Sequence, residues 1–218
     1  MNCVRVPLLD LPEHIRVQIN DSISSNNLVE TDMGKYSPRL EDVLSKINDS
    51  ARQDYIKSIY SGYKARGFTL GAELEKCILE YYSSFFSTLD EEPKITIKVF
   101  TSDAGLPLHS DKKQSCSLTT LISGEGPITE WYEIDDEFKD PYYQDGELKG
   151  NSLPMPHEVR LVEERLLKEW ETYIFNHRAI HKVNTSGLAS KRIMLSAGWL
   201  NTPCYVIEQK YKEWKPTC

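Results

Sequence analysis

Residues 94–111 read KITIKVFTSDAGLPLHSD, and this stretch sets the interpretation of the rest of the chain. Apolar and polar residues alternate over residues 94–99, which is typical of a strand that buries one face. The polar side chains on its other face are those of Lys94, Thr96 and Lys98. The stretch ends in His109 and Asp111, which leave an extended backbone on the same face because they are two positions apart. It therefore predicts a strand followed by an imidazole and a carboxylate that can reach one metal ion together.

The segments before this stretch have the apolar spacing of helices that bury one face. The first of these three segments follows Pro12, the second spans residues 37–51, and the third spans residues 71–89. The aromatic residues of the last segment fit packing against a sheet better than a ligand pocket. A short first strand is expected at residues 4–6.

Strand-like composition returns several times after residue 111. The segments concerned are residues 115–122, 128–134, 173–175, 180–183 and 193–200. Residues 159–167 fit a strand or a helix. Strands that follow one another without crossover helices pair antiparallel, so we expect a mainly β protein with N-terminal helices (α+β). Its core would be a double-stranded β-helix of the jelly-roll or cupin-like type.

Length and composition favour a single folded domain. The chain has 218 residues, of which 39% are hydrophobic and 27% charged, as in ordinary soluble globular proteins. We expect a largely helical supporting part at residues 1–93, the β core at 94–203, and a C-terminal extension at 204–218. Residues 135–157 are acidic and rich in turn formers, which predicts a long loop that is either a lid over a site or a solvated excursion.

Charge and cysteine usage restrict the partners and the compartment. The formal net charge is −7 and the pI is about 5.3, so nucleic acid is a disfavoured partner. The five cysteines are odd in number and form no Cys-x-x-Cys pair, which indicates a reducing compartment and no zinc knuckle. Residues 1–14 lack the continuous apolar core of a signal peptide, and no apolar run approaches the roughly 20 residues of a transmembrane helix. We therefore expect a cytoplasmic protein without a membrane partner.

A third metal ligand and a cation are predicted far along the chain. His181 begins a strand-like run, and Arg192 opens the next one after a turn through Ser186 and Gly187. His177 competes with His181 as the ligand, although its polar neighbours suggest a turn. Two histidines and one carboxylate leave three metal positions open, the arrangement of non-haem Fe(II) oxygenases. Arg192 suits a co-substrate that carries a carboxylate, because a guanidinium binds a carboxylate through two hydrogen bonds.

At this point the sequence resembles the Fe(II)- and 2-oxoglutarate-dependent oxygenase superfamily, whose pattern is His-x-Asp, a distal His, and an Arg or Lys about ten residues later. The matching segments are LPLHSD (106–111), SCSLTTLISGEGPITEWYE (115–133), YIFNHRAIHKVN (173–184) and KRIMLSAGW (191–199). They are most similar to small prolyl- or aspartyl-hydroxylase-like members, including those of phages and marine bacteria, and host cytoplasm is expected if a phage encodes the chain. The resemblance covers about residues 94–200.

The resemblance implies roles for individual residues. His109, Asp111 and His181 would bind iron, and Arg192 would bind the distal carboxylate of 2-oxoglutarate. Phe100 stands near the place of a tyrosine that assists 2-oxoglutarate in some relatives. Met194 replaces the serine of the Arg-x-Ser variant, for which Ser196 on the same face would substitute.

The implied activity is hydroxylation. Fe(II) would be the cofactor, 2-oxoglutarate and O2 would be co-substrates, and succinate and CO2 would be co-products. The substrate would be an amino-acid side chain, free or peptidyl, or a related small molecule. Two alternatives remain: a non-catalytic jelly-roll binding protein, and a cupin-like enzyme that uses another divalent metal without 2-oxoglutarate.

Overall fold

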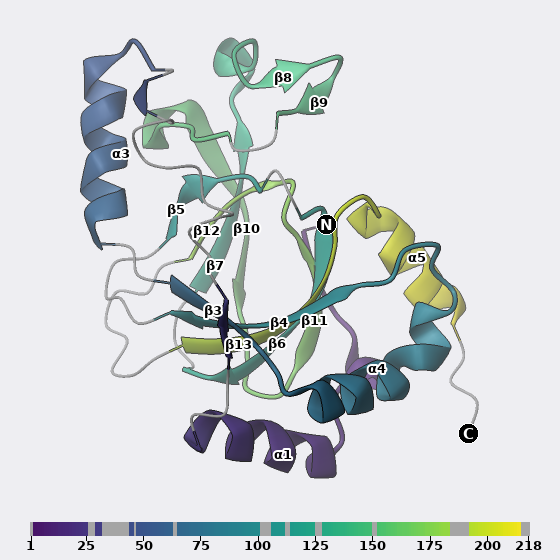
Figure 1. The fold of residues 1–218 in the computed structure, drawn as a ribbon. Helices are drawn as coiled ribbons and strands as arrows, with labels where there is room; N and C mark the ends of the chain where they lie inside the picture. Colours follow the sequence, from purple (N-terminus) through teal and green to yellow (C-terminus); the bar gives the residue numbers. More distant parts are fainter. Residues whose placement is uncertain are drawn as a thin grey trace.

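Two antiparallel sheets face each other and are flanked by helices in the computed structural model (Figure 1). The structure describes residues 2–25, 29–31, 44–45, 47–62, 65–100, 106–111, 114–124, 128–149, 152–183 and 192–214. The helices are α1 (Glu13–Ser24), α3 (Ser50–Gly62), α4 (Ala72–Phe86) and α5 (Cys204–Glu213). The strands are β1 (Cys3–Arg5), β2 (Val29–Thr31), β3 (Ala65–Thr69), β4 (Lys94–Phe100), β5 (Leu106–His109), β6 (Cys116–Ser123), β7 (Ile128–Ile134), β8 (Tyr143–Gln144), β9 (Glu147–Leu148), β10 (Val159–Leu166), β11 (Thr172–Asn176), β12 (Ile180–Val183) and β13 (Arg192–Trp199).

The strand order identifies the fold. The larger sheet runs β1-β11-β6-β13-β4-β3-β2, and the smaller runs β10-β7-β12-β5. From β4 to β7, and again from β10 to β13, successive strands alternate between the two sheets, and β7 and β10 pair as neighbours. This winding of a double sheet is the double-stranded β-helix, and it confirms the predicted mainly β class with a jelly-roll core.

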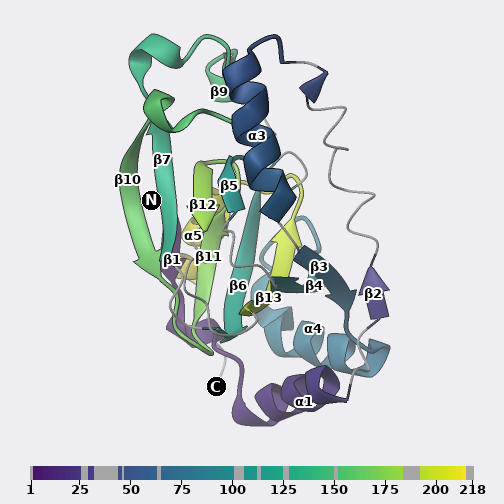
Figure 2. The ribbon, with the colours of Figure 1, turned by 90° about the vertical axis from the view of Figure 1, so that its left-hand side faces the viewer.

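Helices cover the outer face of the larger sheet (Figure 2). Buried residues of α1 and α4 pack against alternate residues of β13, including Ile193, Leu195 and Trp199. The predicted helices at residues 71–89 and after Pro12 are confirmed as α4 and α1. The helix expected at residues 37–51 lies largely outside the described residues, although α3 begins at Ser50.

The second face of β13 and β4 points between the two sheets. Met194 of β13 belongs to an inner cluster with Trp131 of β7 and Phe175 of β11. Lys98 of β4 lies directly opposite Met194, and directly opposed residues in paired strands share a face. The polar face predicted for residues 94–99 therefore lines the interior of the barrel around Lys98, which is partly buried, while Lys94 at the strand's start is exposed.

The long segment at residues 135–157 contains a short hairpin, β8–β9, between two 3-10 turns. Its base is tied to the His-x-Asp tripeptide. The backbone N–H of Ser110 donates to the carbonyl of Ser152 at 3.0 Å, and the Ser110 hydroxyl donates to the carbonyl of Lys149 at 3.1 Å. Residues 159–166, which fitted two predictions, form strand β10.

Cys116 of β6 and Cys204 of α5 form a disulfide. This pair contradicts the expectation of reduced cysteines. The bond could not be foreseen, because the spacing of cysteines along a chain does not show which of them meet in space. Cys3 and Cys77 are free. Within the part of the chain that the structure describes, no helix is long and apolar enough to cross a membrane.

Candidate metal centre

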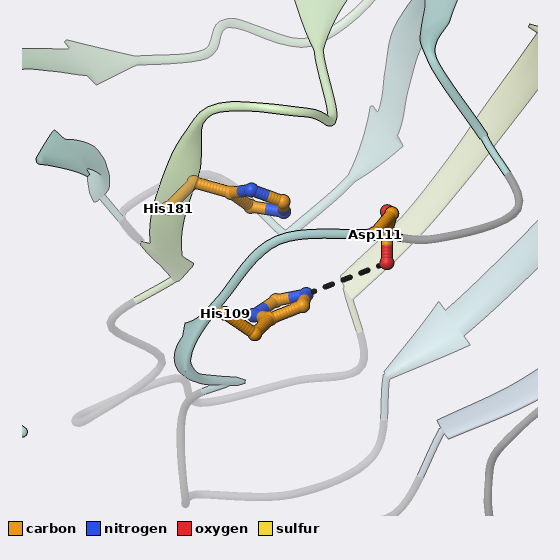
Figure 3. Close-up of side chains that lie close together, drawn as sticks. All are labelled: His109, Asp111 and His181. Carbon is orange, nitrogen blue, oxygen red and sulfur yellow. Dashed lines mark ion pairs between the residues drawn. The ribbon is translucent and has the colours of Figure 1, made fainter. Parts of the chain in front are cut away.

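Three of the predicted ligands converge at one edge of the smaller sheet (Figure 3). His109 ends β5 and lies directly opposite His181 of β12, and the two ring centroids are 4.3 Å apart. Asp111 follows two positions later, with Oδ1 3.7 Å from Nε2 of His109. One ligand atom from each residue lies within 4.8 Å of the other two. Among the described residues this is the one such group, and its spacing suits a single ion.

The ring of His181 is held in the orientation and protonation state of a metal ligand. Its Nδ1–H donates to the carbonyl of Ala179 at 3.0 Å, which leaves the lone pair of Nε2 free. Burial lowers the pKa of His181 well below its usual value, and His109 adds to this effect. Since metals bind neutral imidazole, this environment favours coordination.

His177 is placed behind the ligands. Its Nδ1 lies 2.7 Å from Oδ2 of Asp111, and its Nε2 lies 2.8 Å from Oγ of Ser117. Both ring nitrogens are therefore engaged, and the structure brings His181, not His177, into the group of three. Ser117 in turn lies 2.8 Å from the hydroxyl of Thr119.

The surroundings of Asp111 keep its carboxylate ionised. Burial alone would raise its pKa, but the hydrogen bond from His177 and the neighbouring imidazoles of His177, His109 and His181 lower the pKa far below its usual value. An ionised carboxylate is the form that coordinates metal. Asp111 thus supplies a negative oxygen beside the two imidazole nitrogens.

Arg192 opens β13, and its side chain is only 1% exposed. Its Nε and Nη1 are buried without a hydrogen-bond partner among the described residues. Burial lowers the pKa of Arg192 to about 10, so the guanidinium still carries its charge at neutral pH. A buried cation with unused donors costs free energy unless an anion pairs with it, so this environment fits a bound carboxylate.

Ser196 shares the inner face of β13 with Arg192, as predicted, but lies four positions along the strand, or about 13 Å at the strand's rise per residue. Its hydroxyl accepts a hydrogen bond from Nε2 of Gln114 at 3.3 Å. Sequence reasoning missed Gln114, and it had assigned Lys98 only to the polar side of a strand. The alternation of residues 94–99 does not tell which face of the strand meets solvent, so the sequence carried no signal for the inward position of Lys98. Phe100 lies in β4, but its side chain is outside the described part of the structure.

Comparisons with known proteins give structural likeness only. No family model and no curated protein matches the sequence. The epimerase SnoN, solved with Fe3+, alpha ketoglutarate and nogalamycin RO, is 13% identical with a TM-score of 0.49, over 91% of this chain and 78% of SnoN. YcfD of E. coli is 11% identical with a TM-score of 0.43, over 70% of this chain and 40% of YcfD. The chain therefore spans less than half the length of YcfD. At this level of similarity the fold assignment rests on the strand order itself.

Proposed function

We propose that this chain is an Fe(II)- and 2-oxoglutarate-dependent dioxygenase that hydroxylates an amino-acid side chain, free or peptidyl, or a related small molecule. The observation that carries the proposal is the pairing of two features in one barrel. The first is the group of His109, Asp111 and His181. The second is the buried guanidinium of Arg192, with two nitrogens that have no partner among the described residues.

The residues present fit the metal and the co-substrate. Two imidazoles and one carboxylate are the donor set of non-haem Fe(II) oxygenases, and His109, Asp111 and His181 would hold the ion. Arg192 would hold the distal carboxylate of 2-oxoglutarate, using the donors that are otherwise unused. When bound, Fe(II) would let O2 oxidise both 2-oxoglutarate and a substrate C–H bond, so that one oxygen atom ends in succinate, formed together with CO2, and the other in the new hydroxyl group.

The chain's own part in this reaction is to bind, orient and exclude water. His181 and Asp111 are fixed by Ala179 and His177, as described above. The apolar cluster around Trp131, Phe175 and Met194 fills the interior beside them. A dry, preorganised interior strengthens the charge interaction of Arg192 with a carboxylate and keeps solvent from the reacting groups.

The substrate is expected to be a small molecule or a peptide. The net charge of −7 disfavours a nucleic acid, because the molecule as a whole repels phosphate. A single domain over residues 1–218 belongs to the same proposal. A cytoplasmic location also belongs to it, with the Cys116–Cys204 disulfide as an exception to the reduced cysteines usual in that compartment.

Anaerobic titration tests the proposal. Fe(II) and 2-oxoglutarate are added to the full chain, and the visible metal-to-ligand charge-transfer band of the chelate is expected. His109→Ala should abolish the band, and Arg192→Ala should weaken 2-oxoglutarate binding at least tenfold. His157→Ala is the matched control, because His157 is an exposed histidine outside the ligand group. A wild-type protein without the band would refute the proposed function and favour one of the two alternatives.

A further inference from the structure

The interior of the barrel holds a second cation, Lys98, which the proposed function leaves without a task. Its Nζ donates to Oε1 of Gln114 at 3.1 Å. Gln114 continues to the hydroxyl of Ser196, which accepts from its Nε2 at 3.3 Å. Lys98, Gln114 and Ser196 therefore form a connected polar strip, named here the Lys98 strip, on the inner wall of the larger sheet.

The backbone makes room for this strip at Gly198. Any Cβ added to Gly198 would overlap with Nε2 and Cδ of Gln114. Gln114 can lie flat across β13 only because residue 198 has no side chain. The amide is thus held between Lys98 and Ser196 by shape as well as by hydrogen bonds.

The Lys98 strip begins beside Arg192 and runs along β13 toward the residues behind the metal centre. Lys98 is opposite Met194, and Arg192, two positions before Met194, is opposite Phe100, so the two cations are diagonal neighbours on the inner face. Ser196 and Gly198 lie farther along β13 from Arg192, and Gly198 is opposite Ser117, whose hydroxyl lies 2.8 Å from Nε2 of His177 behind Asp111. Burial lowers the pKa of Lys98, while the carboxylate of Asp111 favours its charged form.

The sum of the charges at the site leaves the ammonium of Lys98 without a counter-charge. If Fe(II) and 2-oxoglutarate bind as proposed above, their opposite double charges cancel, and Asp111 cancels Arg192. Lys98 is then the charge without a counter-charge among the described groups of the site. A partly buried ammonium on the inner wall of the barrel is costly without a counter-ion, and the neutral amide of Gln114 does not provide one.

We propose that Lys98, Gln114 and Ser196 bind a carboxylate of the substrate, so that the substrate is a small carboxylic acid such as a free amino acid. This inference rests on the proposed function and narrows its substrate class. The ammonium supplies the charge, and the amide and hydroxyl supply directional hydrogen bonds. Ser196 thereby contacts the substrate in place of the 2-oxoglutarate contact that the resemblance implied. A residue inside a peptide chain has no backbone carboxylate to place there.

The test uses the full chain loaded anaerobically with Fe(II) and 2-oxoglutarate. The probes are the free L-amino acids, each paired with its carboxamide, and binding is measured by the change in the charge-transfer band. At least one acid is expected to perturb the band, and its carboxamide should bind at least tenfold more weakly. Lys98→Met should weaken binding of that acid at least tenfold while the affinity for 2-oxoglutarate is unchanged. Lys94→Met, on the same strand but exposed, should behave as wild type.

Three results would overturn the inference: equal binding of an acid and its carboxamide, a Lys98→Met variant that loses 2-oxoglutarate instead of the acid, or no response to any acid. A blocked peptide with an aspartate side chain, binding as tightly as a free acid, would also contradict a small-molecule substrate. If the wild type shows no band, the proposed function fails. The Lys98 assignment is then decided by calorimetric binding of the acids to metal-free wild type and Lys98→Met. The band in Lys98→Met, or its circular dichroism, establishes that the variant is folded.

Discussion

His177 and Asp111 are joined twice. The Nδ1–H of His177 donates to Oδ2 of Asp111 at 2.7 Å, and the backbone N–H of Asp111 donates to the carbonyl of His177 at 2.8 Å. Oδ1 of Asp111 is left facing His109. One carboxylate oxygen is therefore held by the protein while the other is available to an ion. Since burial lowers the pKa of His177, its Nε2 accepts a hydrogen bond from Ser117, which fixes the tautomer.

His177→Ala should loosen Asp111 and weaken metal binding. Partners behind a metal ligand are typically worth about 10- to 100-fold in affinity, and we expect a loss of that size. Mn(II) binding followed by electron paramagnetic resonance gives the dissociation constant without turnover. Ser117→Ala should have a smaller effect in the same direction, and His157→Ala none. An unchanged dissociation constant in His177→Ala would show that Asp111 is positioned by other contacts.

Gly198→Ala should disturb the Lys98 strip with little effect on the fold. The new Cβ meets the far end of a flexible side chain, so Gln114 is expected to swing aside at a cost of about 1 kcal/mol. Acid binding should weaken in the charge-transfer titration while 2-oxoglutarate binding persists. Gly71→Ala is the control, because nothing lies within 4 Å of the added atom. Full retention of acid binding in Gly198→Ala would argue against a fixed Gln114.

Cys204→Ser should destabilise the protein by removing the covalent link between α5 and β6. Loss of a native disulfide typically costs about 2–4 kcal/mol of unfolding free energy. Urea unfolding without reductant measures the difference, and Cys77→Ser, which removes a free cysteine, serves as control. Dithiothreitol should lower the wild type to the level of Cys204→Ser and leave that variant unchanged. Insensitivity of the wild type to reductant would contradict the bond.

Glu91 stabilises the junction between β13 and α5 in a pH-dependent way. Its carboxylate accepts from the backbone N–H groups of Leu200 and Thr202, each at 2.9 Å, and from the Thr202 hydroxyl at 2.8 Å. Partial burial alone would raise the pKa of Glu91, but these hydrogen bonds lower it. A lowered pKa in the folded state means that the stabilisation is complete above the unfolded value of about 4.3 and is lost as pH falls through the folded value.

Glu91→Gln should therefore cost about 1 kcal/mol at pH 7, a figure reduced for the group's exposure to solvent. The difference from wild type should shrink below about pH 4. Thermal melts at several pH values measure it, with the exposed neighbour Glu92 changed to Gln as control. A difference that stays constant down to pH 3 would rule out the carboxylate as its source.

The three candidate metal ligands were predictable because each could be recognised from the residues immediately around it. Residues two apart on extended backbone share a face, and the strand-like run around His181 suggested a partly buried ligand, so His109, Asp111 and His181 could be proposed together. The alternation of residues 94–99 also predicted β4 correctly. Local pattern gives the period of a strand, however, and not which face meets solvent, so the inward position of Lys98 followed only from the pairing of β4 with β13.

Other features depend on contacts between distant parts of the chain. His177 resembled a competing ligand, and only the packing of Ser117 and Asp111 around its ring shows what it contacts. The pairing of Cys116 with Cys204 has no sequence signal, since it requires α5 to return to the barrel. The anchoring of residues 135–157 at Ser110 was likewise not foreseen, and whether that segment acts as a lid stays a prediction.

The direct opposition of His109 and His181 has a consequence for the lifetime of the protein. β5 is a four-residue strand at the edge of its sheet, and an ion shared by these two histidines would fasten it to β12. Because the unfolded chain cannot assemble this pair, a metal ion would bind the folded form alone and, at a hundred times its dissociation constant, would add about 2.7 kcal/mol to stability. Mn(II) should raise the melting temperature of wild type but not of His181→Ala. Iron supply would then govern how much of this protein survives proteolysis, as well as how fast it works.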